Sequence, residues 1–301
     1  MPGTPTAPPP LDPLIDAVEG AEVLDGPAKP IGKLVRDVFG PGVVRDILSG
    51  TWLSHSLHPI LTDVVIGSWT SATILDLIGG DDDGAAASRL IGVGIAAYAP
   101  TAVSGTMDWA DSEAVDARVR RTGLVHAAGN LTALGLYAAS LAARRNGNQG
   151  RGKLLGLAGA GVMGAAGFLG GHLSFARGVG VNQTVFDEGS VPEDWTDACA
   201  ADDLKAGEPR SAVVGDTPLM LIRHSDGLHA LHDRCSHRGC SLATGAIEGD
   251  AVTCPCHGSR FRLTDGAIER GPATTPQPAF AARERDGTVE VRRRTPAETA
   301  D

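Results

Sequence analysis

The chain is poor in aromatic residues, in basic residues and in cysteine. Aromatic residues make up 4% of its 301 residues, and 26 Lys and Arg face 36 Asp and Glu, so the formal net charge is -10. A nucleic-acid-binding protein needs a surface of Lys and Arg that displaces counterions from phosphates. This balance argues against nucleic acid as a partner. Five cysteines are too few for a small secreted fold held together by disulfides.

Charged residues are almost missing from four long runs in the first half of the chain. The runs cover residues 59–78, 90–107, 122–143 and 154–175, and their charged side chains are Asp63 and Asp76. A helix of about 20 residues spans the hydrocarbon core of a bilayer, and a soluble helix of that length should show a polar stripe. These runs show none. We expect four transmembrane helices rather than a soluble bundle rich in Ala and Gly.

The N-terminal region precedes the first run. Residues 1–13 are rich in proline and lack the basic and apolar parts of an export signal. Residues 31–48 carry apolar side chains at helical spacing and predict one amphipathic helix, either on the surface of the next domain or at a membrane interface. Residues 1–54 are therefore expected to form a tail and a helix.

Histidines gather at particular ends of the four runs. If the helices thread up and down, His58, Asp108, His126 and His172 come to the same side of the membrane. Ionisable groups at such positions usually face the interior of a bundle and often mark functional sites. One interpretation is hydrogen bonding between helices. The other is a site for a transition-metal ion, a quinone headgroup or a b-type haem held between His58 and His126.

Short motifs support the membrane assignment. The stretches SLHPILTDVVIGSW, SGTMDW, HAAGN and GGHLSFARGVGV resemble an uncharacterised bacterial family of four-helix membrane domains that opens with a His-Pro motif. The resemblance covers about residues 50–182. It implies a multi-pass protein of the cell membrane, in contact with lipid, and it implies no settled activity.

The C-terminal part has a different texture. From about residue 195 to 293, short alternating runs are separated by Gly, Asp and Pro, which is typical of a small all-β unit. Within it stand CSHRGC at 235–240 and CPCHGS at 254–259. Two loops with one thiol and one imidazole each could bind a zinc ion or a two-iron centre. The order of ligands and the glycine in both loops favour iron. The candidate ligands are Cys235, His237, Cys254 and His257.

These two boxes, their flanking strands and the loop GPATTPQP resemble the Rieske [2Fe–2S] domain family over about a hundred residues. The resemblance implies a β-sandwich with an inserted cluster-binding subdomain, and one [2Fe–2S] cluster. In Rieske proteins of cytochrome bc-type complexes, cysteines placed like Cys240 and Cys256 form a disulfide between the loops. Soluble dioxygenase ferredoxins usually lack it. The alternative is that both are buried free thiols.

Two further residues bear on the reduction potential. Ser259 matches the bc-type serine whose hydroxyl bonds a bridging sulfide, and Phe261 stands where high-potential relatives have a tyrosine. Hydrogen bonds to sulfur stabilise the reduced cluster, so the missing hydroxyl should lower the potential relative to those relatives. Arg238 and Arg260 beside the cluster would act in the opposite direction.

The sequence therefore predicts a multidomain protein in which a four-helix transmembrane α-bundle is followed by an all-β Rieske-type sandwich. The expected boundaries are 1–54, 55–180 for the membrane domain, a linker at 181–198, 199–294 for the Rieske domain and a tail at 295–301. We expect the Rieske domain on the cytoplasmic face.

The expected function is one-electron transfer between a membrane-side redox centre or quinol and a partner protein, through exposed imidazoles of His237 and His257. Two other interpretations remain open. The chain could be a quinol-oxidising or haem-containing oxidoreductase subunit, or a redox sensor that uses the pair Cys240 and Cys256. Whether the protein is itself an enzyme stays open.

Overall fold

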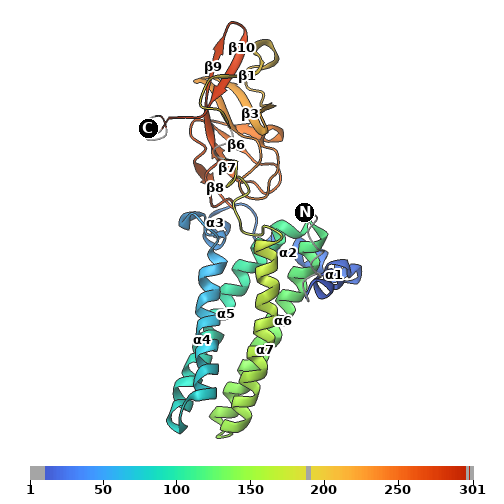
Figure 1. Ribbon diagram of the computed structural model, residues 1–301, viewed down its shortest axis with the longest axis vertical. Helices are drawn as coiled ribbons and strands as arrows, with labels where there is room; N and C mark the ends of the chain where they lie inside the picture. The colour runs from blue at the N-terminus through green and yellow to red at the C-terminus, as the bar shows by residue number, and fades with distance from the viewer. Residues whose placement is uncertain (1–10, 188–190, 296–297, 299–301) are drawn as a thin grey trace, which may run out of the picture. The chain divides into compact units, whose positions relative to one another are not determined.

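A computed structural model describes residues 11–187, 191–295 and 298 of the chain, which divide into two compact units (Figure 1). The helical unit holds the described residues up to Val38 together with His58–Val179. The β unit holds Phe39–Leu57 and the described residues from Gly180 onward. The prediction of four long apolar helices followed by an all-β domain is confirmed. The N-terminal region, expected as one segment, is divided between the two units.

The helical unit is built on four long helices that run alongside one another (Figure 1). Each is long and apolar enough to cross a membrane. They are joined by short connections, one of which contains the 3₁₀ turn η3. The elements of the unit are α1 (Asp12–Gly20), η1 (Glu22–Leu24), α2 (Asp25–Val38), α4 (Leu57–Ile78), η3 (Asp81–Asp83), α5 (Gly84–Glu113), α6 (Ala117–Arg145) and α7 (Gln149–Phe175).

An aromatic cluster ties three of these helices together. Trp69 of α4 is almost fully buried, and its ring stacks on Tyr137 of α6 at 4.1 Å between centroids and on Tyr98 of α5 at 6.3 Å. The Trp69 Nε1–H donates to the carbonyl of Ile91 at 3.3 Å. A Cβ at Gly94 would come within 2.2 Å of that nitrogen, so α5 needs a glycine at this contact.

A buried ion pair joins α4 to α6. The carboxylate of Asp76 bonds the guanidinium of Arg144, and their side chains are 3% and 1% exposed. Arg144 Nε also donates to Ser140 Oγ at 3.2 Å, and that hydroxyl donates to the carbonyl of Gly152 in α7 at 2.6 Å. Of the two carboxylates in the first apolar run, Asp76 is thus paired inside the unit, where an unpaired charge would be costly, whereas Asp63 is exposed.

The single amphipathic helix predicted over residues 31–48 is wrong. Helix α2 ends at Val38, and a new helix, α3 (Val43–Ser49), begins after Gly40, Pro41 and Gly42. Proline disfavours helical geometry in the residue before it and has no N–H to donate, so the helix stops there. Helix α2 stays with the helical unit, whereas α3 and the 3₁₀ turn η2 (Thr51–Leu53) belong to the β unit.

The β unit has two antiparallel sheets. The larger has the order β1-β10-β9-β4-β3-β2, and the smaller, β5-β6-β7-β8, is inserted between β4 and β9. This is the sandwich with an inserted subdomain that the resemblance implied. The elements are β1 (Thr196–Ala200), η4 (Ala201–Asp203), β2 (Arg210–Val214), β3 (Thr217–His224), β4 (Gly227–His232), η5 (Leu242–Thr244), β5 (Ala246–Glu248), β6 (Ala251–Thr253), β7 (Arg260–Arg262), β8 (Ile268–Arg270), β9 (Ala279–Arg285) and β10 (Thr288–Arg292).

Strand β3 is buried on both faces and separates two hydrophobic cores. Leu219 and Leu221 point into the core of the larger sheet, whereas Met220 and Ile222 point toward the inserted subdomain. The second core contains Phe261 of β7, which is fully buried. The loops that follow β4 and β6 are therefore anchored on rigid, well-packed strands.

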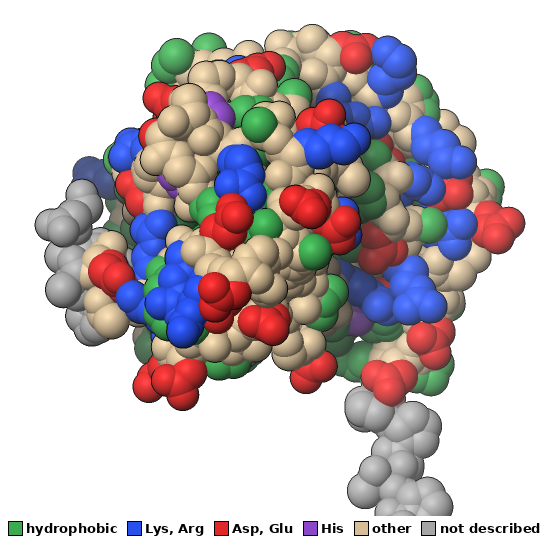
Figure 2. Space-filling model, turned by 90° about the horizontal axis from the view of Figure 1, so that it is seen from above, with side chains coloured by type: hydrophobic (Ala, Val, Ile, Leu, Met, Phe, Trp, Pro, Cys, Tyr) green, Lys and Arg blue, Asp and Glu red, His purple; other side chains and the backbone are tan. Residues whose placement is uncertain are grey.

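The face shown in Figure 2 intersperses acidic and basic side chains. Within the β unit, several acidic and basic side chains are paired across strands, such as Arg223 with Glu284 at 2.8 Å and Arg283 with Glu290 at 2.6 Å. Surface pairs of this kind contribute little to stability, and they leave a surface of mixed sign.

Candidate metal centre

Two loops of the β unit have the same backbone hydrogen-bonding pattern. In the first, the N–H of Cys235 donates to the carbonyl of Cys240 at 2.8 Å. In the second, the N–H of Cys254 donates to the carbonyl of Ser259, also at 2.8 Å. Each loop therefore closes on the residue five positions after its first cysteine.

A glycine at the same place closes both loops. Gly239 donates its N–H to the carbonyl of Cys235 at 2.8 Å, and Gly258 donates to the carbonyl of Cys254 at 3.0 Å. Their φ angles are +77° and +79°, a conformation in which a side chain is strained. The glycine that the sequence shows in each box is thus needed to fold the loop back.

The two thiols lie in contact with one another. Cys235 and Cys254 share a hydrogen bond, which is the main cause that lowers the pKa of Cys254 to about 7 and raises the pKa of Cys235. Each sulfur also accepts two backbone N–H groups from the residues two and three positions further on. Such donors stabilise negative charge on sulfur, which is the form of cysteine that binds metals.

The two imidazoles lie beside each other. The rings of His237 and His257 are 5.0 Å apart between centroids, with planes at 87°. Burial is the main cause that lowers the pKa of His237 well below its usual value, and the charges of His257, Arg238 and Arg45 add to it. The neutral imidazole that results is the ligating form. The sequence predicted exposed imidazoles, but His257 is buried, with 9% exposed.

This donor set fits a [2Fe–2S] cluster. Two adjacent sulfurs, each with N–H donors, suit one iron, and two adjacent neutral imidazoles suit the other. All four side chains come from the paired loops, so their positions depend on the backbone geometry described above.

Comparison with known proteins agrees with this geometry. Residues 194–281 match the family model described as Rieske [2Fe-2S] domain, and residues 54–183 match Predicted membrane protein (DUF2231). Ferredoxin CarAc of Metapseudomonas resinovorans is 36% identical over 98 residues, which cover 32% of this chain and 92% of that protein. The chain belongs to the Rieske [2Fe–2S] family. Its Rieske domain is joined to a DUF2231 membrane domain in the same polypeptide.

Other relatives of the Rieske domain are similar in extent. The anthranilate 1,2-dioxygenase ferredoxin subunit of Burkholderia cepacia is 36% identical over 98 residues, 33% of this chain and 91% of that protein. The solved structure of the ferredoxin of carbazole 1,9a-dioxygenase from Nocardioides aromaticivorans IC177 is 25% identical. It is matched over 33% of this chain and 98% of that one, with a TM-score of 0.32.

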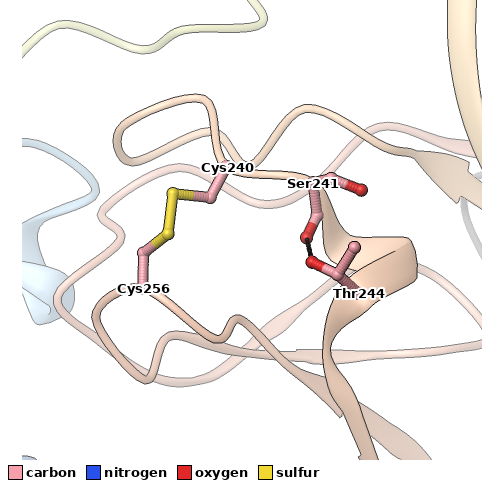
Figure 3. The surroundings of a disulfide bond; sticks show 4 residues. All are labelled: Cys240, Ser241, Thr244 and Cys256. Atoms are coloured by element: carbon pink, nitrogen blue, oxygen red, sulfur yellow. Dashed lines mark hydrogen bonds between the residues drawn. A yellow bond between two sulfur atoms is a disulfide. The ribbon is translucent and has the colours of Figure 1, made fainter. Parts of the chain in front are cut away.

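A disulfide joins the two loops of the Rieske domain (Figure 3). Cys240 and Cys256 are bonded, with their Cα atoms 6.5 Å apart, as the resemblance to bc-type proteins implied. Beside them, Thr244 donates its hydroxyl to the carbonyl of Ser241 at 2.9 Å. The remaining cysteine, Cys199, is a half-buried free thiol in β1, and burial raises its pKa.

The proline-rich loop supports both boxes of the Rieske domain. Gln277 donates its Nε2–H to the carbonyl of Arg234 at 2.6 Å, and its Oε1 accepts the N–H of Ser236 at 2.9 Å. Ser259, fully buried, accepts the N–H of Ala273 at its hydroxyl oxygen at 3.0 Å. The bond from Ser259 to a sulfide stays a prediction. Gln277 was missed because no motif distinguishes it.

An N-terminal strap, residues 39–57, packs on the same end of the Rieske domain. Asp46 Oδ1 accepts the N–H of Gly271 at 3.0 Å, and Thr51 Oγ1 donates to the carbonyl of Ala273 at 3.2 Å. These partners are 225 and 222 residues apart in the chain. The strap therefore holds the proline-rich loop that in turn supports the boxes.

The strap also reaches the two boxes themselves. Pro41 lies against Gly258, close enough that an added Cβ would contact its ring. Arg45 is 6% exposed, and its charge acts on His237. Neither contact could be predicted, because the strap carries no motif of its own.

In the membrane domain, two predicted site histidines bond to neighbouring helices. His58 Nδ1 donates to the carbonyl of Thr101 at 3.0 Å, and His126 Nδ1 donates to the carbonyl of Ala166 at 2.8 Å. Both contacts match the interpretation of hydrogen bonding between helices. A ligand at the other ring nitrogens stays a prediction.

The other two predicted site residues have different surroundings. His172 Nε2 lies 2.8 Å from Glu19 Oε1 of α1, and Arg177 bonds the same carboxylate. Burial raises the pKa of Glu19, but these hydrogen bonds outweigh it and lower the pKa overall. Asp108 is half-buried in α5. A single site shared by all four residues stays a prediction.

Proposed function

We propose that this protein is a membrane-anchored one-electron carrier in which Cys235 and Cys254 bind one iron of a [2Fe–2S] cluster and His237 and His257 bind the other. The observation that carries this proposal is the pair of matching loops, which bring two thiols and two imidazoles together. The cluster would supply reversible uptake of a single electron.

The side chains and backbone around the centre have distinct roles in this proposal. The N–H groups on both sulfurs stabilise the charge that an added electron brings. The disulfide between Cys240 and Cys256 keeps the loops together. Buried strands β3 and β7 hold the loops in place, so little structure needs to rearrange when the charge changes.

The relatives support a protein as the redox partner. Two of them are named as ferredoxins or as a ferredoxin subunit of a dioxygenase, which describes carriers that act with other components. For this chain we propose electron transfer between a membrane-side donor, such as a quinol, and a partner protein. A haem or quinone at His58 and His126 is the basis of the alternative, a catalytic oxidoreductase subunit.

Purified full-length protein distinguishes these functions. We expect membrane-bound protein with two iron atoms per chain, a Rieske EPR signal after dithionite reduction and uptake of one electron per chain in a redox titration. Zinc in place of iron would contradict the proposal. A Soret band would instead favour a haem-containing subunit, and reduction of the disulfide before the cluster would favour a sensor.

The side of the membrane on which the Rieske domain lies stays a prediction. Four crossings would put the strap before α4 and the Rieske domain after α7 on the same side, which is consistent with the bond from Asp46 to Gly271. We expect that side to be the cytoplasm. Protease added to intact cells should leave the Rieske domain uncut, while the same protease should digest it in inverted vesicles. Digestion in intact cells would show the opposite orientation.

A further inference from the structure

A second group of metal-ligating side chains lies in the β3–β4 hairpin, in sequence outside both cluster loops. His224 ends β3, Asp226 stands in the turn and His229 lies in β4. In the hairpin register His224 is opposite Gly227, and Ile222 is opposite His229. Both histidines therefore project from the same face of the hairpin, the face on which Ile222 packs toward the inserted subdomain.

Three potential ligand atoms converge on this face. Asp226 Oδ1 lies 2.9 Å from His224 Nδ1 and 2.8 Å from His229 Nε2. The three atoms all lie within 4.8 Å of one another. Ligand atoms bound to one tetrahedral ion at about 2.0–2.2 Å are roughly 3.3 Å apart, so Asp226 Oδ1 would move slightly away from both nitrogens as it gave up their hydrogen bonds to an ion.

A fourth candidate ligand, a second carboxylate, lies at the edge of the group. Asp250, in the turn between β5 and β6, has its Oδ1 4.0 Å from His224 Nδ1. The two imidazoles are largely buried, with side chains 17% and 10% exposed, whereas the carboxylates of Asp226 and Asp250 are 48% and 78% exposed. The nitrogens are thus held in place by packing while the carboxylates leave an entry path from solvent.

We propose that His224, Asp226 and His229 bind a divalent transition-metal ion of the zinc class, with Asp250 as a fourth ligand. Two imidazoles with carboxylates are a ligand set that such ions prefer over calcium or magnesium. The ion would replace the two N–H hydrogens that now point at Asp226.

Such an ion would connect the two sheets. Asp226 belongs to the hairpin of the larger sheet, and Asp250 to the turn of the inserted subdomain. An ion bound by both residues would link the inserted subdomain to the hairpin. Among the strands described, no ladder of backbone hydrogen bonds joins the two sheets there. The site thus adds a structural ion to a domain whose other metal centre is for electron transfer.

Zinc binding to the full-length, cluster-loaded protein tests this site. After treatment with a chelator and removal of any affinity tag, equilibrium dialysis should show one Zn²⁺ bound per chain at free concentrations below about 100 µM, with iron content unchanged. Zinc should also raise the unfolding temperature. Asp226→Asn keeps an oxygen that accepts from both histidines but removes the charge, and it should weaken zinc binding at least tenfold.

Further variants separate the site from other surface groups. Asp216→Asn changes an exposed carboxylate in the β2–β3 turn and should leave zinc binding unchanged. His229→Gln should weaken zinc binding as Asp226→Asn does. If His229→Gln does not fold because the histidine is buried, Asp226→Asn alone decides whether the site binds zinc. Equal zinc binding by wild type and Asp226→Asn, or no saturable binding by wild type, would overturn the proposal.

Discussion

Replacing His237 with Ala is expected to abolish the Rieske EPR signal of the reduced full-length protein. In the proposed centre, His237 and His257 bind the same iron, and their rings lie 5.0 Å apart between centroids. Without His237 that iron would keep only the imidazole of His257 and lose one of its two nitrogen ligands. Removal of a ligand should cost the cluster and leave insertion of the membrane domain unchanged. EPR and iron analysis of detergent-solubilised protein, with membrane fractionation alongside, measure both effects.

The control uses an exposed residue of the same domain. Asp216 lies in the turn between β2 and β3, and Asp216→Asn should keep the cluster signal at the wild-type level. An undiminished signal in His237→Ala would refute the ligand assignment. Loss of the signal in both variants would mean that the domain, rather than the ligand, had been disturbed.

Replacing Arg144 with Met is expected to destabilise the membrane domain by about 3–5 kcal/mol. The change removes one partner of a pair whose side chains are 1% and 3% exposed, and so leaves the carboxylate of Asp76 buried without its counter-charge. It also removes the bond from Arg144 Nε to Ser140. Unfolding of the solubilised protein by heat or by denaturing detergent, followed by tryptophan fluorescence, to which the buried Trp69 contributes, would measure the loss.

The neighbouring residue supplies the control. Arg145 is exposed at the end of α6, and Arg145→Met should change stability by less than about 0.5 kcal/mol. The double variant Asp76→Leu with Arg144→Met removes both charges and should recover most of the stability. Equal effects of Arg144→Met and Arg145→Met would contradict a role for the buried pair.

The sequence predicted the features that depend on local patterns. The two ligand loops could be predicted because each contains a cysteine, a histidine and a glycine within six residues. A loop of that length has few ways to fold. The four membrane helices could be read because an uncharged run of some 20 residues has a physical reason to be helical in lipid. Phe261 and Ser259 came from the same local motif.

The features that were missed depend on contacts between distant segments. Gln277, Asp46 and Thr51 each make hydrogen bonds to residues more than 40 positions away, and their own neighbours in sequence give no periodic or compositional signal. The contact of His172 with Glu19 spans 153 residues, and the four apolar runs alone could not predict it because Glu19 lies outside them. The prediction of one helix over residues 31–48 was wrong because it gave more weight to the apolar spacing than to the proline at position 41.

The strap has a consequence for the order in which the protein is made. Thr51 is synthesised 222 residues before its partner Ala273, which at about 5–20 residues per second is a delay of roughly 11–44 s. During that interval α4–α7 are synthesised, while Gly271 and Ala273, to which the strap bonds, have not yet been made. The strap can take its place in the Rieske unit only after the proline-rich loop that contains Gly271 and Ala273 has been synthesised. In a chain truncated before Gly271, the strap would lack this partner. The bond between Asp46 and Gly271 can therefore form only in a chain that already contains both cluster loops.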